Sequence, residues 1–275
     1  MKINEIKEVL AKNPSKNFLE LLQEDERKSV KKLLLTYYKK QQKATVEKDR
    51  FSKMLYYEKQ CFANGWDLIA GVDEAGRGPL AGPLVIAAVV LPESIFISGL
   101  NDSKKLTPIT REKLYNEILA KAIDITVNIV SVSNIDNLNI YRATQQGMTQ
   151  VLEAMHCKPQ VALIDAMPVS VNGMAITSII HGDALSVSIA AASIIAKVTR
   201  DRIMQQLDKI YPVYCFAQNK GYGTKAHMQA IAQYGATQWH RRSFEPIKSM
   251  YLPPVKGEEN FIYSPLIETC NYSVK

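Results

Sequence analysis

The chain has 275 residues, of which 47% are hydrophobic, and its formal net charge is +7. This length accommodates one large domain with an appendage, or two modest domains. No apolar run is long enough to cross a bilayer, and the N-terminus lacks the apolar segment of a signal peptide. Cys61, Cys157, Cys215 and Cys270 show no Cys-x-x-Cys spacing, which argues against zinc and a disulfide framework. We therefore expect a cytoplasmic protein.

The excess positive charge lies in the first quarter of the chain. Residues 1–66 contain 15 lysines and arginines against 9 aspartates and glutamates. Apolar periodicity predicts four helices here, the second capped by Ser15, the third starting near Asp25 and the last covering about 46–64. A basic helical appendage on a nearly neutral body indicates a polyanionic partner such as nucleic acid. The alternative is a solvated helical face without a partner.

From Leu68 onward, strands and helices alternate. Five apolar runs read as strands, at 68–73, 84–91, 124–132, 161–164 and 175–180. Helices are expected at 108–122, 140–155, 186–210 and from Thr224 to Gly235. Small residues at the start of the third of these helices should let it lie close to the sheet. The pattern predicts an α/β fold, with a mixed sheet flanked by helices on both faces.

Two adjacent carboxylates, Asp73 and Glu74, end the first of these strands. They precede a glycine-rich turn that contains Arg77. Adjacent residues of a strand point to opposite faces, so one carboxylate should face a site while the other lies at its rim. A carboxylate at the centre of a buried sheet is costly unless it is paired or binds a cation. The alternative is a charged strand end that leads into an ordinary turn.

Two further aspartates, Asp165 and Asp183, lie at a strand end or just before a helix. The carboxyl ends of strands are where α/β folds place their sites, so these side chains are expected to converge with Asp73 and Glu74. Converging carboxylates repel one another unless divalent cations join them. Oxygen ligands suit Mg²⁺ or Mn²⁺, and two such ions suit in-line hydrolysis of a phosphodiester. Asp201 is the rival fourth ligand, but its place inside a helix favours a local pairing with Arg200, Arg202 or Gln205.

Seven short blocks resemble ribonuclease HII, the type 2 ribonuclease H family, and they occur in the family's order. The resemblance covers about 68–246. The blocks that carry it are DEAGRG (73–78), DSKKL (102–106), LIDA (163–166), GD (182–183) with SIAAASI (188–194), KVTRD (197–201), KGYGT (220–224) and HRRSF (240–244). The resemblance implies a ribonuclease H-like catalytic domain over 67–248. It leaves a helical basic substrate-binding appendage at 1–66 and a C-terminal tail at 249–275.

The resemblance also implies roles for individual residues. Metal ligands and catalytic groups are expected at Asp73, Glu74, Asp165 and Asp183. The Gly76-Arg77-Gly78 turn would grip the ribonucleotide at an RNA–DNA junction, and Tyr222 would stack on the neighbouring deoxyribose. Phosphate contacts are expected from Ser103, Lys104, Lys105 and Lys197. Taken singly, these features also fit a tight turn, a core tyrosine and solvated lysines. The HRRSF block receives no clear role.

The implied activity is endonucleolytic hydrolysis of the RNA strand of RNA–DNA hybrids, with incision at single ribonucleotides embedded in duplex DNA. The products would carry 3′-hydroxyl and 5′-phosphate ends. A DNA resolvase or integrase-like nuclease is the alternative enzyme, and the glycine-rich turn with Tyr222 argues against it. A non-catalytic nucleic-acid-binding protein would gain nothing from four carboxylates near phosphates. No protein partner is indicated, and we expect a monomer.

Overall fold

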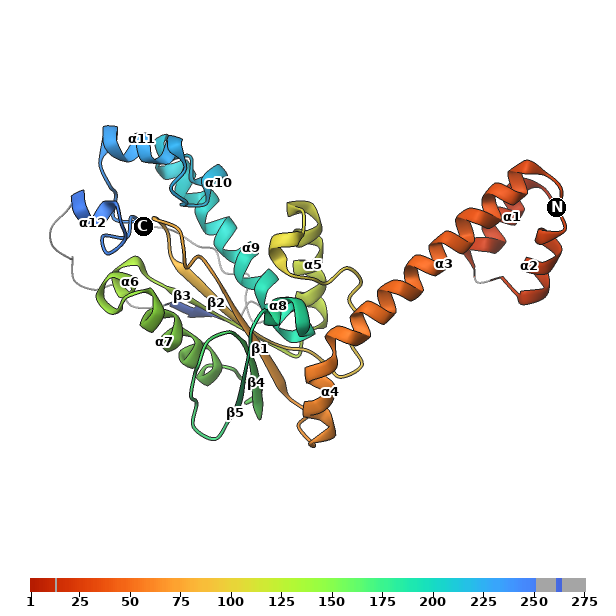
Figure 1. The fold of residues 1–275 in the computed structure, drawn as a ribbon, viewed down its shortest axis with the longest axis horizontal. Helices are drawn as coiled ribbons and strands as arrows, with labels where there is room; N and C mark the ends of the chain where they lie inside the picture. The colour runs from red at the N-terminus through yellow and green to blue at the C-terminus, as the bar shows by residue number, and fades with distance from the viewer. Residues whose placement is uncertain (13, 251–260, 264–275) are drawn as a thin grey trace. The chain divides into compact units, whose positions relative to one another are not determined.

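The computed structural model describes residues 1–12, 14–250 and 261–263. It divides into two compact units, with the boundary after Ser52 (Figure 1). None of the described helices combines the length and the apolar character that crossing a membrane requires.

The first unit is helical, as the sequence predicts. It consists of α1 (Ile3–Ala11), α2 (Lys16–Gln23) and most of α3 (Lys28–Met54). Ser15 caps α2 by accepting a hydrogen bond from the backbone N–H of Phe18. The core of this unit is a small apolar cluster of Ile6, Leu10, Leu22, Val30 and Leu34.

The predicted fourth helix over 46–64 has wrong bounds. The chain contains neither glycine nor proline between Lys28 and Met54, so α3 continues without a break through the expected boundary. A separate helix, α4 (Tyr56–Ala63), follows at Leu55 and belongs to the second unit.

The second unit is built on a six-stranded mixed sheet with the order β5-β4-β1-β2-β3-β6. Its strands are β1 (Ile69–Ala75), β2 (Leu84–Val90), β3 (Asp124–Val130), β4 (Val161–Asp165), β5 (Ala175–Ile179) and β6 (Phe261–Tyr263). β1 is antiparallel to β2 and parallel to β4, which confirms the predicted mixed sheet. β6 pairs with β3 and was not predicted, since it falls in the expected C-terminal tail.

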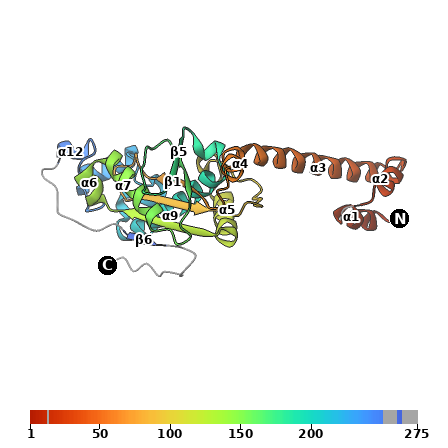
Figure 2. The ribbon, with the colours of Figure 1, turned by 90° about the horizontal axis from the view of Figure 1, so that it is seen from below.

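Helices flank both faces of this sheet (Figures 1 and 2). The helices of this unit after α4 are α5 (Pro108–Lys121), α6 (Val132–Leu138), α7 (Ile140–Glu153), α8 (Gly182–Leu185), α9 (Val187–Ile210), α10 (Phe216–Asn219), α11 (Lys225–Tyr234) and α12 (Ile247–Met250). The predicted helices correspond to α5, α7, α9 and α11. α9 packs on β1 and β2 at one face, and α7 packs on β2 and β3 at the other.

The contact between α9 and β1 is unusually close. A Cβ at Gly71 would lie 2.0 Å from the carbonyl carbon of Ser188, so only glycine fits beneath the helix. Ala190, Ala191 and Ala192 follow on α9 and are fully buried. The prediction that small residues bring this helix against the sheet is confirmed. The close approach places α9 directly over the strand that carries Asp73.

Candidate metal and nucleic-acid site

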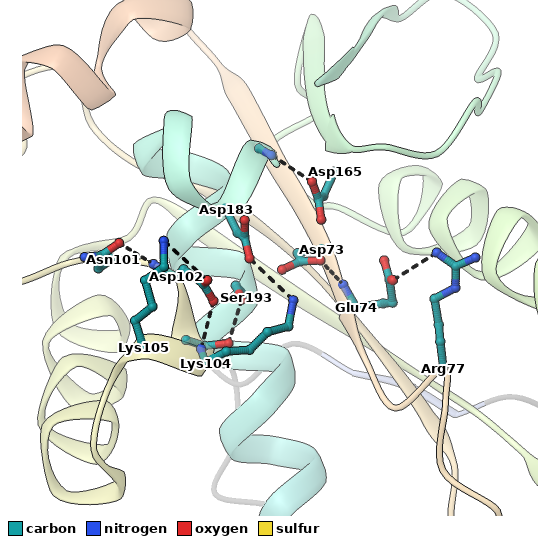
Figure 3. A network of polar contacts seen from close by, with 12 residues as sticks. Asp73, Glu74, Arg77, Asn101, Asp102, Lys104, Lys105, Asp165, Asp183 and Ser193 are labelled. Atoms are coloured by element: carbon teal, nitrogen blue, oxygen red, sulfur yellow. Dashed lines mark hydrogen bonds and ion pairs between the residues drawn. The ribbon is translucent and has the colours of Figure 1, made fainter. Parts of the chain in front are cut away.

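Three aspartates from separate segments converge at the end of the sheet (Figure 3). Asp73 lies on β1, Asp165 ends the neighbouring parallel strand β4, and Asp183 lies in α8. One carboxylate oxygen from each lies within 4.8 Å of the others. We call these three residues the aspartate cluster. The proximity that the sequence predicts for them is present in the structure.

Backbone N–H donors hold two members of the aspartate cluster. Asp73 is buried and accepts a hydrogen bond of 2.7 Å from the backbone N–H of Glu74, and the Ser193 hydroxyl on α9 interacts with it so as to lower its pKa. Asp165 accepts a 2.7 Å bond from the backbone N–H of Gly182. Because Gly182 begins α8, this bond ties the end of β4 to the helix that carries Asp183.

Glu74 lies beside the aspartate cluster without joining its group of three. It follows Asp73 on β1 and pairs with Ile86 in the ladder, so its side chain points to the other face of the sheet. One carboxylate oxygen lies 3.5 Å from a guanidinium nitrogen of Arg77. The charge of Asp165 still acts on Glu74 and helps to raise its pKa. Glu74 therefore borders the cluster at its rim.

Two members of the aspartate cluster, Asp73 and Asp183, have raised pKa values. Burial first, and then the charges of Glu74 and Asp165, raise the pKa of Asp73 well above its ordinary value. Burial and the neighbouring Asp102 raise the pKa of Asp183. Lys104 supplies a partly compensating charge 3.6 Å from the Asp183 carboxylate. Ionising Asp73 and Asp183 together is therefore costly unless further positive charge lies beside them.

A divalent cation fits this donor set. The three-residue group offers carboxylate oxygens and contains neither histidine nor cysteine. Hard cations such as Mg²⁺ and Mn²⁺ prefer such ligands, whereas zinc sites in proteins are usually built from histidine and cysteine. A bound cation would also remove the repulsion that helps to raise the pKa values of Asp73 and Asp183. The aspartate cluster would hold it, with Glu74 adjacent.

The turn that follows β1 is held by a buried arginine that sequence reasoning missed. The Arg241 guanidinium donates to the carbonyl oxygens of Gly76, Arg77 and Gly82 at 2.6–3.1 Å. Gly76 has a φ of +102°, and a Cβ there would meet Arg200 at 2.1 Å. Arg241 belongs to the HRRSF block, whose basic residues were the available signal.

A second buried arginine supports the far end of the same turn. Arg200 donates to the carbonyl oxygens of Ala81, Pro83 and Lys220, each at about 3 Å. The Gly221 carbonyl accepts a 2.8 Å bond from the backbone N–H of Leu80. The turn and the 220–222 segment are therefore fastened together.

Tyr222 lies next to the glycine-rich turn. A Cβ added to Gly78 would lie 3.6 Å from Cε1 of the Tyr222 ring, and that ring is half-exposed. The four residues expected to contact the sugars, Gly76, Arg77, Gly78 and Tyr222, thus lie in one place. Their roles there remain predictions.

Comparisons with known proteins agree on one family. The Ribonuclease HII model matches residues 70–247, which is more than half of the chain, and the Ribonuclease HII N-terminal domain model matches residues 2–62. The chain belongs to the ribonuclease HII family. As a member of this family with the fold described above, it is a metal-dependent hydrolase that acts as a nuclease.

Relatives of this chain include the Ribonuclease HII of Bacillus thuringiensis strain Al Hakam. The two are 54% identical over 231 residues, which cover 84% of this chain and 90% of the relative. The crystal structure of ribonuclease H2 from Pyrococcus horikoshii matches with a TM-score of 0.58 and 31% identity, over 66% of this chain and 96% of the other. The ribonuclease HII solved in complex with PCNA from Archaeoglobus fulgidus matches with a TM-score of 0.55 and 27% identity, over 65% and 95%. The ribonuclease H-like fold is thereby confirmed.

The residues expected to contact phosphates occupy different environments. Ser103 is buried, and its hydroxyl lies 2.8 Å from that of Ser193. Lys104 is largely exposed and reaches Asp183. Lys197 pairs with Asp201 at 2.6 Å, one helical turn away. Asp201 therefore has a local partner, as expected, but the partner is Lys197 instead of the neighbouring arginines or Gln205.

Proposed function

We propose that this protein hydrolyses the RNA strand of RNA–DNA hybrids and incises at single ribonucleotides embedded in duplex DNA. The observation that carries the proposal is that a member of the aspartate cluster and the glycine-rich turn lie together at the end of β1. Asp73 of the aspartate cluster and the Gly76–Gly78 turn are separated by only two residues. A sugar held by the turn would place its phosphodiester beside the carboxylates.

Asp73, Glu74, Asp165 and Asp183 would hold two Mg²⁺ or Mn²⁺ ions. When bound, such ions activate a water molecule for in-line attack and stabilise the leaving oxygen. The buried aspartate cluster supports this proposal, because its charge is otherwise compensated only in part. Hydrolysis in this sense leaves a 3′-hydroxyl and a 5′-phosphate.

Recognition of ribose requires a contact with the 2′-hydroxyl. Arg241 holds the carbonyl oxygens of Gly76 and Arg77. In a trans peptide the N–H points opposite to the preceding C=O, so the N–H groups of Arg77 and Gly78 are directed away from Arg241. We propose that these amides donate to the 2′-hydroxyl while Tyr222 stacks on the next sugar. The absence of a Cβ at Gly78 keeps the approach open.

The helical unit at the N-terminus is proposed to bind the phosphate backbone of the same substrates. α3 carries a series of exposed lysines, namely Lys28, Lys31, Lys32, Lys39, Lys40, Lys43 and Lys48. Lysines that neutralise phosphates release counterions, which makes affinity depend on salt. This unit would add affinity without choosing the cleavage position.

Neutralising part of this lysine series should weaken hybrid binding. Replacing Lys31, Lys32, Lys39 and Lys40 by glutamine is expected to lower the salt dependence of log Kd by up to about 0.9 per lost phosphate contact. Fluorescence anisotropy with a labelled hybrid over a salt series measures it, while kcat stays near the parent value. The matched control replaces four exposed lysines of the second unit, Lys113, Lys158, Lys209 and Lys225. Equal slopes for both variants and the parent would show that α3 does not contact the substrate.

Duplex DNA with one internal ribonucleotide tests the proposed activity directly. We expect incision at the ribonucleotide with Mg²⁺ or Mn²⁺, none with EDTA, and none of an all-DNA duplex under any condition. An RNA–DNA hybrid should be cut in its RNA strand only. Cleavage of the all-DNA duplex would instead support the resolvase-like alternative.

A further inference from the structure

The short helix α4 is part of the catalytic body, although the family's N-terminal domain model extends over it. Cys61 of α4 packs in one apolar cluster with Ile69 of β1, Val161 of β4 and Ile189 of α9. Phe62 and Tyr57 extend the same contact. α4 therefore joins the strands and the helix that position the aspartate cluster.

Glu58 is the buried charged residue of α4, with only 3% of its surface exposed. One of its carboxylate oxygens accepts two hydrogen bonds, from the Ser186 hydroxyl at 2.6 Å and from the backbone N–H of Ser188 at 2.9 Å. The Ser186 oxygen in turn accepts the backbone N–H of Ile189 at 3.2 Å and so caps α9. Glu58 thus completes the N-terminal cap of α9 from another segment of the chain.

The physical chemistry of this contact calls for an acceptor oxygen at position 58. The first N–H groups of a helix have no partners within the helix, and they carry a partial positive charge. Burial raises the pKa of Glu58, while the hydrogen bonds from Ser186 and Ser188 oppose that shift. A residue with no acceptor at position 58 would leave a buried N–H and a buried hydroxyl without their partner.

The junction that Glu58 fixes lies between two parts of the aspartate cluster. Ser186 is the C-terminal cap of α8, the single helical turn that carries Asp183. Ser188 lies over Gly71 on the strand that carries Asp73, and Ser193, five residues further along α9, interacts with the Asp73 carboxylate. A shift at 186–188 would therefore move Asp183 and the part of α9 that covers Asp73 together.

We propose that Glu58 is a positioning residue for the metal site, acting through the α8–α9 junction. The inference rests on the proposed function, because it takes Asp73 and Asp183 as metal ligands. Glu58 lies outside the aspartate cluster and contacts neither substrate nor metal in this role. It sets the geometry in which the carboxylates meet the cation.

Substitution of Glu58 in the full chain tests this role. Glu58→Ala should weaken Mn²⁺ binding, measured by isothermal titration calorimetry, about 10-fold, which is typical of residues that support metal ligands indirectly. Its kcat on an RNA–DNA hybrid should fall by a similar factor, while KM stays within about twofold. Glu58→Gln keeps an acceptor oxygen and should restore both values nearly to the parent level.

The controls separate positioning from folding. Cys61→Ala removes packing from the same helix without touching α9's cap, so it should lower the thermal midpoint and leave Mn²⁺ affinity and kcat unchanged. If Glu58→Ala does not fold, Glu58→Asp serves instead, because its side chain is one methylene shorter and holds the acceptor oxygen further from Ser186 and Ser188. This variant must show smaller losses of Mn²⁺ affinity and kcat. Parent-like Mn²⁺ affinity and kcat in the folded variant, or equal losses in Cys61→Ala, would overturn the inference.

The two proposals fail in different ways. If the parent protein cuts no hybrid, the proposed function fails, and Mn²⁺ binding still reports on Glu58. If the parent cuts hybrid and binds Mn²⁺ while the Glu58 variants match it, only the positioning role is lost.

Discussion

Asp73→Asn is expected to abolish metal-dependent cleavage, lowering kcat by about 1000-fold or more. Asp73 is the least exposed member of the aspartate cluster, and an amide is a poorer and uncharged ligand for a hard cation. Electrostatic stabilisation by a bound metal contributes several kcal/mol, and each 1.36 kcal/mol corresponds to a factor of ten in rate. Single-turnover cleavage of a labelled hybrid at saturating enzyme measures the loss.

The same substitution should stabilise the metal-free protein at neutral pH. The folded state raises the pKa of Asp73 above its ordinary 3.8, so the folded protein binds a proton more tightly than the unfolded chain. Stability is therefore lost as pH rises from about 3.8 toward the raised value, and a neutral asparagine escapes this loss. In EDTA, thermal midpoints of parent and variant should be similar near pH 4, with the variant higher at pH 7.

Bound metal should reverse the order of the thermal midpoints of the parent and Asp73→Asn. Mg²⁺ that binds only the folded state raises the midpoint of the parent, whereas Asp73→Asn should respond weakly. Asp67→Asn, at an exposed position just before β1, is the matched control and should behave as the parent throughout. Parent-level turnover in Asp73→Asn would remove Asp73 from the catalytic site, and an unchanged midpoint in EDTA at pH 7 would contradict the electrostatic argument.

Arg241→Met is expected to destabilise the protein by about 3 kcal/mol or more. The substitution leaves the carbonyl oxygens of Gly76, Arg77 and Gly82 without the donor they share, at about 1–3 kcal/mol for each buried group left unpaired. For a unit of this size, each kcal/mol lowers the thermal midpoint by roughly 2–4 °C. Burial and Arg200 lower the pKa of Arg241 to about 9, so the guanidinium remains charged at pH 7. The loss is therefore present across the physiological range.

The Arg241 variant should also lose discrimination for ribose. With the turn released, KM for duplex DNA containing one ribonucleotide should rise more than KM for a continuous hybrid, which has further contacts along the strand. Arg202→Met is the control, because Arg202 pairs with Glu112 at the surface, and such pairs contribute about 1 kcal/mol at most. Equal midpoints for the two variants would show that the bonds of Arg241 to the turn carry no net stability.

The aspartates of the cluster could be found from sequence because each carries a local signal. Asp73 and Asp165 end apolar runs, and Asp183 precedes a helix rich in small residues. The basic HRRSF block draws attention to Arg241, but no local pattern indicates what it binds, since its partners are backbone carbonyls more than 150 positions earlier. The role of Glu58 could not be predicted from the sequence either. On a charged helix a glutamate is expected to be solvated, and only the tertiary contact with Ser186 shows that it is buried.

The limits of secondary-structure prediction have similar causes. The strands at 69–75 and 161–165 follow from apolar runs that the sheet buries on both faces. The three-residue strand β6 exists because β3 offers a free edge, which no local pattern encodes. The division of 46–64 into α3 and α4 depends on a break at Leu55, a residue with good helix propensity.

The close contact at Gly71 restricts how this enzyme can vary. A methyl group at position 71 would clash with the first turn of α9 and push it away from β1, because the helix backbone already occupies the space that the methyl group needs. The displaced helix would carry Ser193 away from Asp73 and shift α8, the adjoining helical turn that contains Asp183. The distance between the Asp73 and Asp183 carboxylates therefore depends on position 71 having a hydrogen atom in place of a side chain. Substitution of this inconspicuous glycine should be tolerated no better than loss of a metal ligand.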